Sequence, residues 1–147
     1  MIDRSGIICA GNWIVDLVHD VDRWPNESEL VRIGVQTRGV GGGAANVITA
    51  LAKLETGLPL YPMGAIGKDE YGTFIIDECR RLGVPTSGLI SKTNFATAHT
   101  HVMSVAGQSR TFFYQGGAND TLTTNDFPEG PFKGTSARIF YLGYLTL

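Results

Sequence analysis

Short apolar runs that end at glycine alternate along this chain with longer runs of helical period. Residues 7–10 are apolar and end at Gly11, as expected for a buried strand of a parallel sheet. Residues 47–54 follow the glycines at 39–43 and place apolar side chains at helical spacing. Their apolar face consists of Val47, Leu51 and Leu54, with Ile48 and Ala52 beside them. This pattern predicts an α/β fold with a helix that begins at a glycine-rich turn.

A second helix is predicted after Asp69. Its apolar side chains share one face: Tyr71, Phe74, Ile75, Cys79 and Leu82. Asp69 is placed to act as the N-cap, and Gly83 with Pro85 ends the helix. We interpret Asp69 as a cap rather than as a catalytic group.

Several further segments are predicted to be extended. Four of them contain strand-forming residues around turn-forming ones: residues 14–22, 30–38, 97–105 and 110–115. The last two flank a short loop with Gly107, which is typical of a hairpin. Residues 58–63 and 137–145 are interpreted as core strands, with prolines suited to strand ends, and residues 120–136 as loop.

The composition limits the classes of function. The 147 residues are 43% hydrophobic and 18% charged, as in globular proteins. A formal net charge of −2 and the lack of a Lys/Arg cluster argue against nucleic acid as a partner. No run approaches the ~20 apolar residues of a membrane span, so no membrane partner is expected. Cys9 and Cys79 are isolated and no signal-peptide pattern is visible, so we expect reduced thiols in a cytoplasmic protein.

Two histidines invite a metal assignment. His99 and His101 lie on the same face of a predicted strand, but no third ligand stands at a suggestive spacing. We therefore predict no metal site and interpret both residues as solvated strand histidines.

The glycine-rich turn is the main candidate for chemistry. The sequence Gly39-Val40-Gly41-Gly42-Gly43-Ala44-Ala45-Asn46 removes side chains where the helix begins. Free N–H groups and the positive end of the helix dipole then meet at a bare surface, which suits anionic or hydroxyl-rich ligands. A structural interpretation also stands, in which the glycines only allow a tight turn or close packing.

Three motifs carry a resemblance to a known family. The stretch at 42–46, the helix after it and the stretch at 63–72 resemble the first signature of ribokinase-like carbohydrate kinases, the PfkB family. Gly11-Asn12-Trp13-Ile14-Val15-Asp16 is similar to the family's sugar-contacting segment. Gly117-Ala118-Asn119 is similar to its return from the lid. The resemblance runs from about Ile7 to Leu142 in the family's order.

This resemblance implies a ribokinase-like α/β domain with a parallel-sheet core flanked by helices. A small β-sheet lid is implied at residues 14–22, 30–38, 97–105 and 110–115. The implied activity is ATP-dependent phosphorylation of a sugar or nucleoside hydroxyl, with a homodimer through the lid as in some family members. The implied substrate-binding residues are Asn12, Asp16, Gly41, Gly42, Gly43, Asn46 and Asn119. Asp16 also fits an exposed strand position, and Asn119 equally fits a turn cap before Thr121.

The family's catalytic half is not matched. Its catalytic Asp, in a Gly-Ala-Gly-Asp or similar motif, and its residues for ATP and Mg²⁺ belong to a C-terminal half that these residues do not resemble. We expect residues 1–147 to be the N-terminal portion of one domain, with the catalytic base beyond Leu147 and no phosphoryl transfer by the chain alone. Gly43 replaces the Lys of ribokinase and several phosphosugar kinases of the family, which weakens the case for ribose or a phosphorylated sugar. Gly143 also replaces the acid that ribokinases tend to carry, so another free sugar such as a ketohexose, or a nucleoside, stays open.

Two other functions are weighed against a kinase. One is a catalytically inactive sugar-binding or dimerising module. The other is a dinucleotide-binding oxidoreductase domain, since Gly39-x-Gly41-x-x-Ala44 formally matches the dinucleotide-binding fingerprint. That fingerprint belongs in the first βα turn with an acid about 20 residues on, whereas here it lies well after the first strand and no acid stands near residue 64. The kinase interpretation is preferred.

Overall fold

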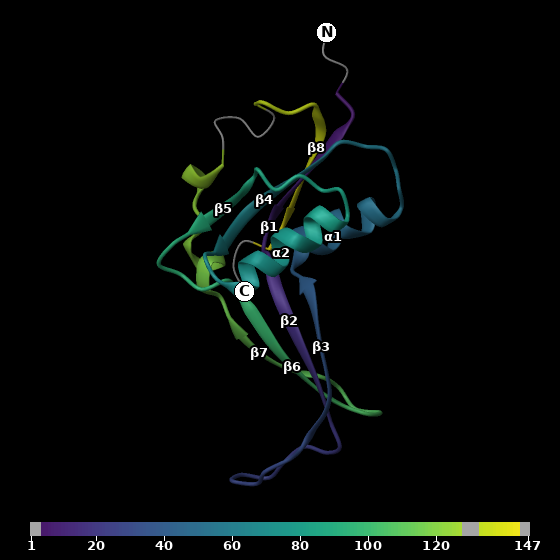
Figure 1. The fold of residues 1–147 in the computed structure, drawn as a ribbon, viewed down its shortest axis with the longest axis vertical. Helices are drawn as coiled ribbons and strands as arrows, with labels where there is room; N and C mark the ends of the chain where they lie inside the picture. The colour runs from purple at the N-terminus through teal and green to yellow at the C-terminus, as the bar shows by residue number, and fades with distance from the viewer. Residues whose placement is uncertain (1–3, 128–132, 145–147) are drawn as a thin grey trace.

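A computed structural model of the chain describes residues 4–127 and 133–144. Its strands form two four-stranded sheets. In Figure 1 the strands β1, β4, β5 and β8 lie in the upper half of the view, and β2, β3, β6 and β7 extend below them. The predicted α/β architecture with a parallel core sheet is confirmed. Part of the loop expected at 120–136 and the last residue of the strand expected at 137–145 lie outside the described residues.

The first sheet, called the parallel sheet here, has the order β5-β4-β1-β8 with every neighbouring pair parallel. Its strands are β1 (Gly6–Gly11), β4 (Leu60–Gly67), β5 (Leu89–Lys92) and β8 (Ala137–Gly143). The pattern does not predict β5, because four residues are too few to show a period. The prediction that the prolines lie at strand ends is wrong for Pro62, which lies inside β4. The strand tolerates it because β5 pairs with β4 only from Gly64 onward, so Pro62 precedes that ladder.

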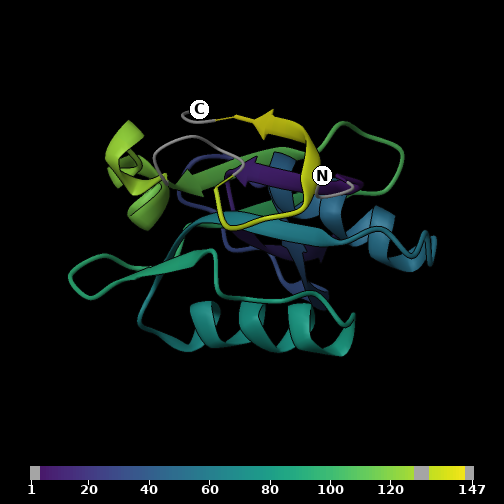
Figure 2. The same ribbon diagram turned by 90° about the horizontal axis from the view of Figure 1, so that it is seen from above.

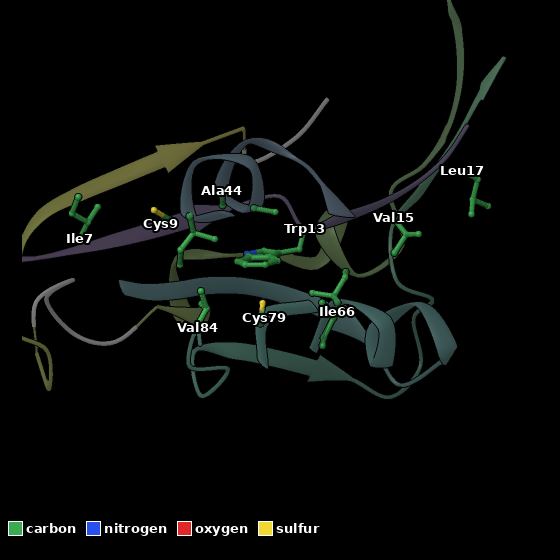
Figure 3. Close-up of a cluster of buried hydrophobic side chains, with 12 residues drawn as sticks. Ile7, Cys9, Trp13, Val15, Leu17, Ala44, Ile66, Cys79 and Val84 are labelled. Atoms are coloured by element: carbon green, nitrogen blue, oxygen red, sulfur yellow. The ribbon is translucent and has the colours of Figure 1, made fainter. Parts of the chain in front are cut away.

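Alternate side chains of β1 enter two different apolar clusters. Ile7 and Cys9 join a cluster that contains residues of both helices, so both helices cover this face of the sheet. Ile8 and Ala10 join a smaller cluster on the opposite face, with Met63. Figure 2 shows α2 running along one side of the parallel sheet. In Figure 3 the indole ring of the fully buried Trp13 lies in the middle of the larger cluster.

Helix α1 (Gly43–Lys53) begins at the glycines, as predicted. Ala44, Ala45 and Ile48 are its buried residues, and Val47, Leu51 and Ala52 pack against the same cluster. Leu54 was predicted on the buried face, but it is 72% exposed. It is the C-cap, so the chain has already left the face that points to the core.

Helix α2 (Glu70–Arg81) confirms the second predicted helix. The carboxylate of Asp69 accepts a hydrogen bond from the N–H of Gly72 at 2.8 Å, so Asp69 is the predicted N-cap. Ile75 and Cys79 are buried, and the other members of the predicted apolar face pack against them. Cys9 and Cys79 are free thiols, and burial raises the pKa of each to about 11.

The second sheet, called the mixed sheet here, has the order β3-β2-β6-β7. Its strands are β2 (Ile14–Val21), β3 (Ile33–Gly41), β6 (His99–Val105) and β7 (Thr111–Gln115). The β2–β6 pair is parallel, whereas the β2–β3 and β6–β7 pairs are antiparallel, so the predicted hairpin is present. Strand β3 begins and ends three residues later than predicted, because residues 39–41 pair with residues 14–16.

Two short 3₁₀ helices follow the mixed sheet, η1 (Gly117–Thr121) and η2 (Thr124–Asp126). They return the chain from β7 toward β8 of the parallel sheet. Within residues 4–127 and 133–144 no helix is long and apolar enough to cross a membrane.

Candidate functional site

Three consecutive glycines join the mixed sheet to helix α1. Gly41 ends β3, Gly42 is the N-cap with a φ of 96°, and Gly43 is the first helical residue. The left-handed backbone of Gly42 favours glycine, and no side chain caps the helix. The first helical bond runs from the N–H of Asn46 to the carbonyl of Gly42, at 2.9 Å. The N–H groups before it have no partner within the helix, and Gly42 and Gly43 place no side chain over them; ligand binding at this helix start stays a prediction.

The carboxylate of Asp16 lies directly against this turn. An ideal Cβ built on Gly41 would be 2.9 Å from Cγ of Asp16 and would overlap its Oδ2 atom. A methyl group at Gly41 therefore has no room while Asp16 keeps this position. Glycine here allows an acidic side chain and a helix N-terminus to share one small region.

Two other strand ends approach the same turn. An ideal Cβ on Gly42 would be 2.8 Å from the carbonyl carbon of Asn12, just after β1. A Cβ on Gly43 would be 3.1 Å from Cα of Gly143, at the end of β8. The carboxyl ends of β1 and β8 thus meet the start of α1, the usual place for ligands in an open α/β sheet. The contact with β8 also explains the small residue at position 43.

The side chain of Asn12 has an unusual environment. It is only 1% exposed, and neither its Oδ1 nor its Nδ2 atom has a hydrogen-bond partner among the described residues. A buried amide without a partner is costly, and such groups occur where a ligand is bound. The backbone carbonyl of Asn12 lies against Gly42, so the residue that carries this amide adjoins the helix start.

Burial raises the pKa of Asp16 above its ordinary value of 3.8, while a hydrogen bond from Thr100 and the charge of Arg110 lower it. Thr100 of β6 lies opposite Asp16 of β2, and Tyr114 of β7 lies opposite Thr100. Residues directly opposite each other project to the same face of a sheet. Thr100 and Tyr114 therefore extend the polar surface that begins at Asp16. Sequence reasoning did not identify either residue, because the β2–β6 register is a long-range property.

Asn119 lies beneath the site rather than at its surface. Its Oδ1 accepts a hydrogen bond from the N–H of Trp13 at 3.3 Å, and its Nδ2 donates one to the carbonyl of Trp13 at 3.1 Å. It is 1% exposed. Asn119 therefore fixes the backbone between β1 and β2, and its predicted contact with a substrate stays a prediction. Asn46, in the first turn of α1, is exposed.

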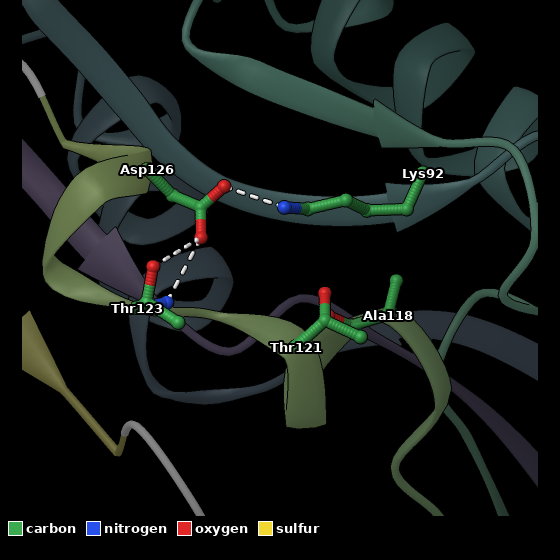
Figure 4. A network of polar contacts seen from close by, with 5 residues as sticks. All are labelled: Lys92, Ala118, Thr121, Thr123 and Asp126. Carbon is green, nitrogen blue, oxygen red and sulfur yellow. Dashed lines mark hydrogen bonds and ion pairs between the residues drawn. The ribbon is translucent and has the colours of Figure 1, made fainter.

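An ion pair anchors the segment that carries Asn119. Lys92 Nζ lies 2.5 Å from Asp126 Oδ1, and both side chains are mostly buried. Oδ2 of Asp126 also accepts hydrogen bonds from the N–H and the hydroxyl of Thr123, at 2.9 and 3.1 Å (Figure 4). Lys92 thus ties the end of β5 to η2 and is not a free cation for a ligand.

Solvated strand histidines are predicted from the sequence, but in the structure His101 contacts another histidine. Nε2 of the buried His19 lies 3.0 Å from Nδ1 of the half-buried His101, and their rings are stacked with centroids 5.2 Å apart. The prediction was wrong because it did not include His19 of the neighbouring strand. Burial and the nearby His19 and His99 lower the pKa of His101. In the described parts of the chain, no group of three or more His, Cys, Asp or Glu side chains could hold a metal ion.

Comparison with curated proteins identifies sugar kinases as relatives. The ribokinase of Bacillus subtilis (strain 168) is 32% identical over 118 residues, which are 79% of this chain and 39% of that protein. Fructokinase-2 of Oryza sativa subsp. japonica is 29% identical over 119 residues, 80% of this chain and 34% of that protein. The chain thus spans between about a third and two fifths of the length of these relatives.

Solved structures show the same fold. The structure of Arabidopsis thaliana ribokinase complexed with ribose and ATP has a TM-score of 0.71 at 25% identity, over 84% of this chain and 41% of that one. The nucleoside kinase of Methanocaldococcus jannaschii has a TM-score of 0.78 at 19% identity, over 95% of this chain and 44% of that one, and supports the fold alone. The sequence profile of the pfkB family carbohydrate kinases matches residues 4–143. This chain belongs to the pfkB carbohydrate kinase family and has its ribokinase-like fold.

Proposed function

We propose that this chain forms the acceptor-binding part of an ATP-dependent kinase that phosphorylates a sugar hydroxyl. The observation that carries the proposal is the Asp16 carboxylate lying against Gly41, at the uncapped start of α1. Membership of a carbohydrate kinase family supports the class of substrate. A nucleoside, which also presents sugar hydroxyls, remains within the proposal.

The residues present are suited to hold hydroxyl groups. The carboxylate of Asp16 accepts hydrogen bonds from two neighbouring hydroxyls, and such charge-assisted bonds are stronger than neutral ones. The N–H groups at Gly42 and Gly43 donate to hydroxyl oxygens that approach the bare backbone. The buried amide of Asn12 supplies both a donor and an acceptor. Asn46 and Asn119 complete the set of substrate-binding residues in this proposal.

The mixed sheet is the proposed lid over the sugar. Its strand β2 carries Asp16, and β6 and β7 carry Thr100 and Tyr114 on the same face. Several large apolar side chains of this sheet are exposed: Ile33, Val35, Phe112 and Phe113. They lie on β3 and β7, the two edge strands of this sheet. Exposed apolar side chains favour association, so a homodimer through the lid is part of the proposal.

ATP and Mg²⁺ are the cofactors that the family implies. The described residues include no cluster of carboxylates or histidines suited to a metal ion, and Lys92 is already paired. The described residues therefore do not fit a Mg²⁺ site. We propose that the catalytic base and the ATP site belong to a part of the enzyme outside residues 1–147.

The free thiols of Cys9 and Cys79 support a cytoplasmic location.

A thermal-shift panel tests this proposal on the 147-residue chain. D-Ribose, D-fructose, adenosine and NAD are added separately to wild type and to the Asp16→Asn variant. We expect at least one of the first three to raise the melting temperature of wild type, and the shift to shrink in the variant, because a ligand that binds only the folded state stabilises it. Stabilisation by NAD alone would support an oxidoreductase domain instead. No shift with any compound contradicts the proposed acceptor site.

A further inference from the structure

The N-cap Asp69 makes a second set of contacts that capping does not require. Its Oδ2 accepts a hydrogen bond from the N–H of Thr97 at 2.7 Å, and its Oδ1 accepts one from the Thr97 hydroxyl at 2.6 Å. The Thr97 hydroxyl oxygen in turn accepts a bond from the N–H of Gly67, at 2.8 Å. Thr97 is fully buried. One carboxylate therefore joins the end of β4, the start of α2 and the chain just before β6.

The backbone around this contact is packed without spare room. An ideal Cβ on Gly67 would overlap the N atom of Thr97, and one on Gly72 would be 3.0 Å from the Thr97 hydroxyl. The N–H of Ala118 also donates to the carbonyl of Ala96 at 2.8 Å. The chain before β6 is thus held by side-chain and backbone contacts from three directions.

This contact lies a short distance along the chain from Asp16. The carbonyl of Ala98, the residue after Thr97, accepts a hydrogen bond from the N–H of Val15 at 3.0 Å. Two residues further on, Thr100 is the register partner of Asp16 and its hydrogen-bond donor. A shift of residues 97–100 would therefore move Asp16 relative to the start of α1.

We propose that Asp69 is a positioning residue of the sugar site, which fixes the start of β6 through Thr97 and thereby holds Asp16 against Gly41. This inference rests on the proposed function, because it assigns a role toward the same site. Asp69 itself touches neither the glycine turn nor a substrate. Its Oδ1 accepts from both the Gly72 N–H and the Thr97 hydroxyl, whereas its Oδ2 accepts from the Thr97 N–H.

Substitutions can separate this role from capping. Asn caps helices about as well as Asp, so Asp69→Asn keeps the bond to Gly72, but its amide NH₂ faces the Thr97 N–H and cannot accept from it. Thr97→Val removes the hydroxyl without a change of charge, and Thr97→Ser keeps the hydroxyl. Asp77→Asn removes an exposed carboxylate from the same helix and is the control for charge.

The experiment measures the dissociation constants of D-ribose and D-fructose by titration calorimetry, together with the melting temperature. We expect Asp69→Asn and Thr97→Val to weaken sugar binding by at least about tenfold, since misplacement of a positioning group by about 1 Å is costly. Thr97→Ser and Asp77→Asn are expected to bind like wild type. If Asp69→Asn and Thr97→Val melt earlier but bind sugar like wild type, Asp69 is only structural and the proposal is overturned.

A second readout does not depend on sugar binding. The pKa of Asp16 is measured by NMR titration of its carboxyl carbon in wild type and in Thr97→Val, without sugar. We expect the pKa of Asp16 to change in the variant, because a shift of residues 97–100 alters both its burial, which raises the pKa, and its hydrogen bond from Thr100, which lowers it. If wild type binds neither sugar, the proposed function fails. If the Asp16 pKa is also the same in wild type and in the variant, the role of Asp69 is overturned as well. If Thr97→Val does not fold, Asp69→Asn is titrated instead.

Discussion

The carboxylate of Asp16 lies against the bare backbone of Gly41, where even a methyl group would overlap it. Asp16 comes from β2 and Gly41 from the end of β3, so the antiparallel pairing of these strands creates the contact. The next two residues begin helix α1, whose uncapped N–H groups are donors. An acceptor and a set of donors thus stand side by side, which is the arrangement that a sugar with several hydroxyls requires.

Gly41→Ala is predicted to weaken sugar binding. Gly41 has no positive φ, so alanine fits its backbone and the damage comes from displacement of Asp16. We expect a loss of about tenfold or more in affinity by titration calorimetry, since a hydrogen bond to a charged group contributes about 1.5–3 kcal/mol. The matched control is Gly34→Ala, near the other end of the same strand, where the nearest atom that a Cβ would meet is the carbonyl oxygen of Asp20, at 3.6 Å. Equal affinities in the two variants would contradict the placement of the site.

Sugar affinity is predicted to fall on acidification, whereas the contribution of Asp16 to the free energy of unfolding is predicted to rise. Burial raises the pKa of folded Asp16 above 3.8, so the folded state holds this proton more tightly than the unfolded state. Between 3.8 and the raised pKa, protonation of Asp16 therefore stabilises the fold, yet it removes the carboxylate that accepts the sugar hydroxyls. Affinity measured against pH is expected to fall through a midpoint above 3.8 in wild type. The sugar affinity of the Asp16→Asn variant is expected not to change with pH in this window. A pH dependence equal to that of wild type contradicts Asp16 as the group that accepts the sugar hydroxyls.

Asn119→Ala is predicted to destabilise the fold. It leaves the N–H and the carbonyl of the buried Trp13 without these partners. Each unsatisfied buried group costs about 1–3 kcal/mol, so the free energy of unfolding measured in urea is expected to fall by about that amount or more. The exposed Asn46 is the control: Asn46→Ala should leave stability unchanged but weaken sugar binding. A stable Asn119→Ala variant would contradict the role given to this amide.

Gly11→Ala is predicted to be more damaging than alanine at a positive-φ glycine whose Cβ position is in open space. Gly11 has a φ of +127°, and its Cβ would overlap the carbonyl oxygen of Gly143. Gly107 also has a positive φ, but a Cβ there meets nothing within 4 Å. Backbone strain alone costs about 1–3 kcal/mol, so we expect Gly107→Ala to lower the free energy of unfolding in urea by only that amount. If Gly11→Ala lowers it by no more than Gly107→Ala does, a close contact between the ends of β1 and β8 is contradicted.

Local patterns were sufficient for the helices and for most strands. The start of α1 at the glycines and the Asp69 cap depend on neighbouring residues, so the sequence shows them directly. The position of Leu54 depends on where the helix turns away from the core, and periodicity alone does not show that. The strand β5 is too short for any period to be seen.

The parts of the site that sequence reasoning missed depend on long-range pairing. Asn119 was named as a candidate site residue, but its bonds to Trp13 were not foreseen, because the two residues are 106 positions apart and only the fold shows that their atoms meet. Thr100 reaches Asp16 through the register of β2 with β6, which a one-residue shift would change completely. Asp69 was recognised as a cap, but its bond to Thr97 spans 28 residues and carries no local signal.

Titration calorimetry of wild type and Asp16→Ala with D-ribose and D-fructose tests whether Asp16 accepts the sugar hydroxyls. We expect wild type to bind one of these sugars and the variant to bind it at least about tenfold more weakly, since a charged acceptor is lost. Melting of the variant should match or exceed that of wild type, because a buried carboxylate is removed. Binding of equal strength in both proteins would contradict Asp16 as the acceptor of the sugar hydroxyls.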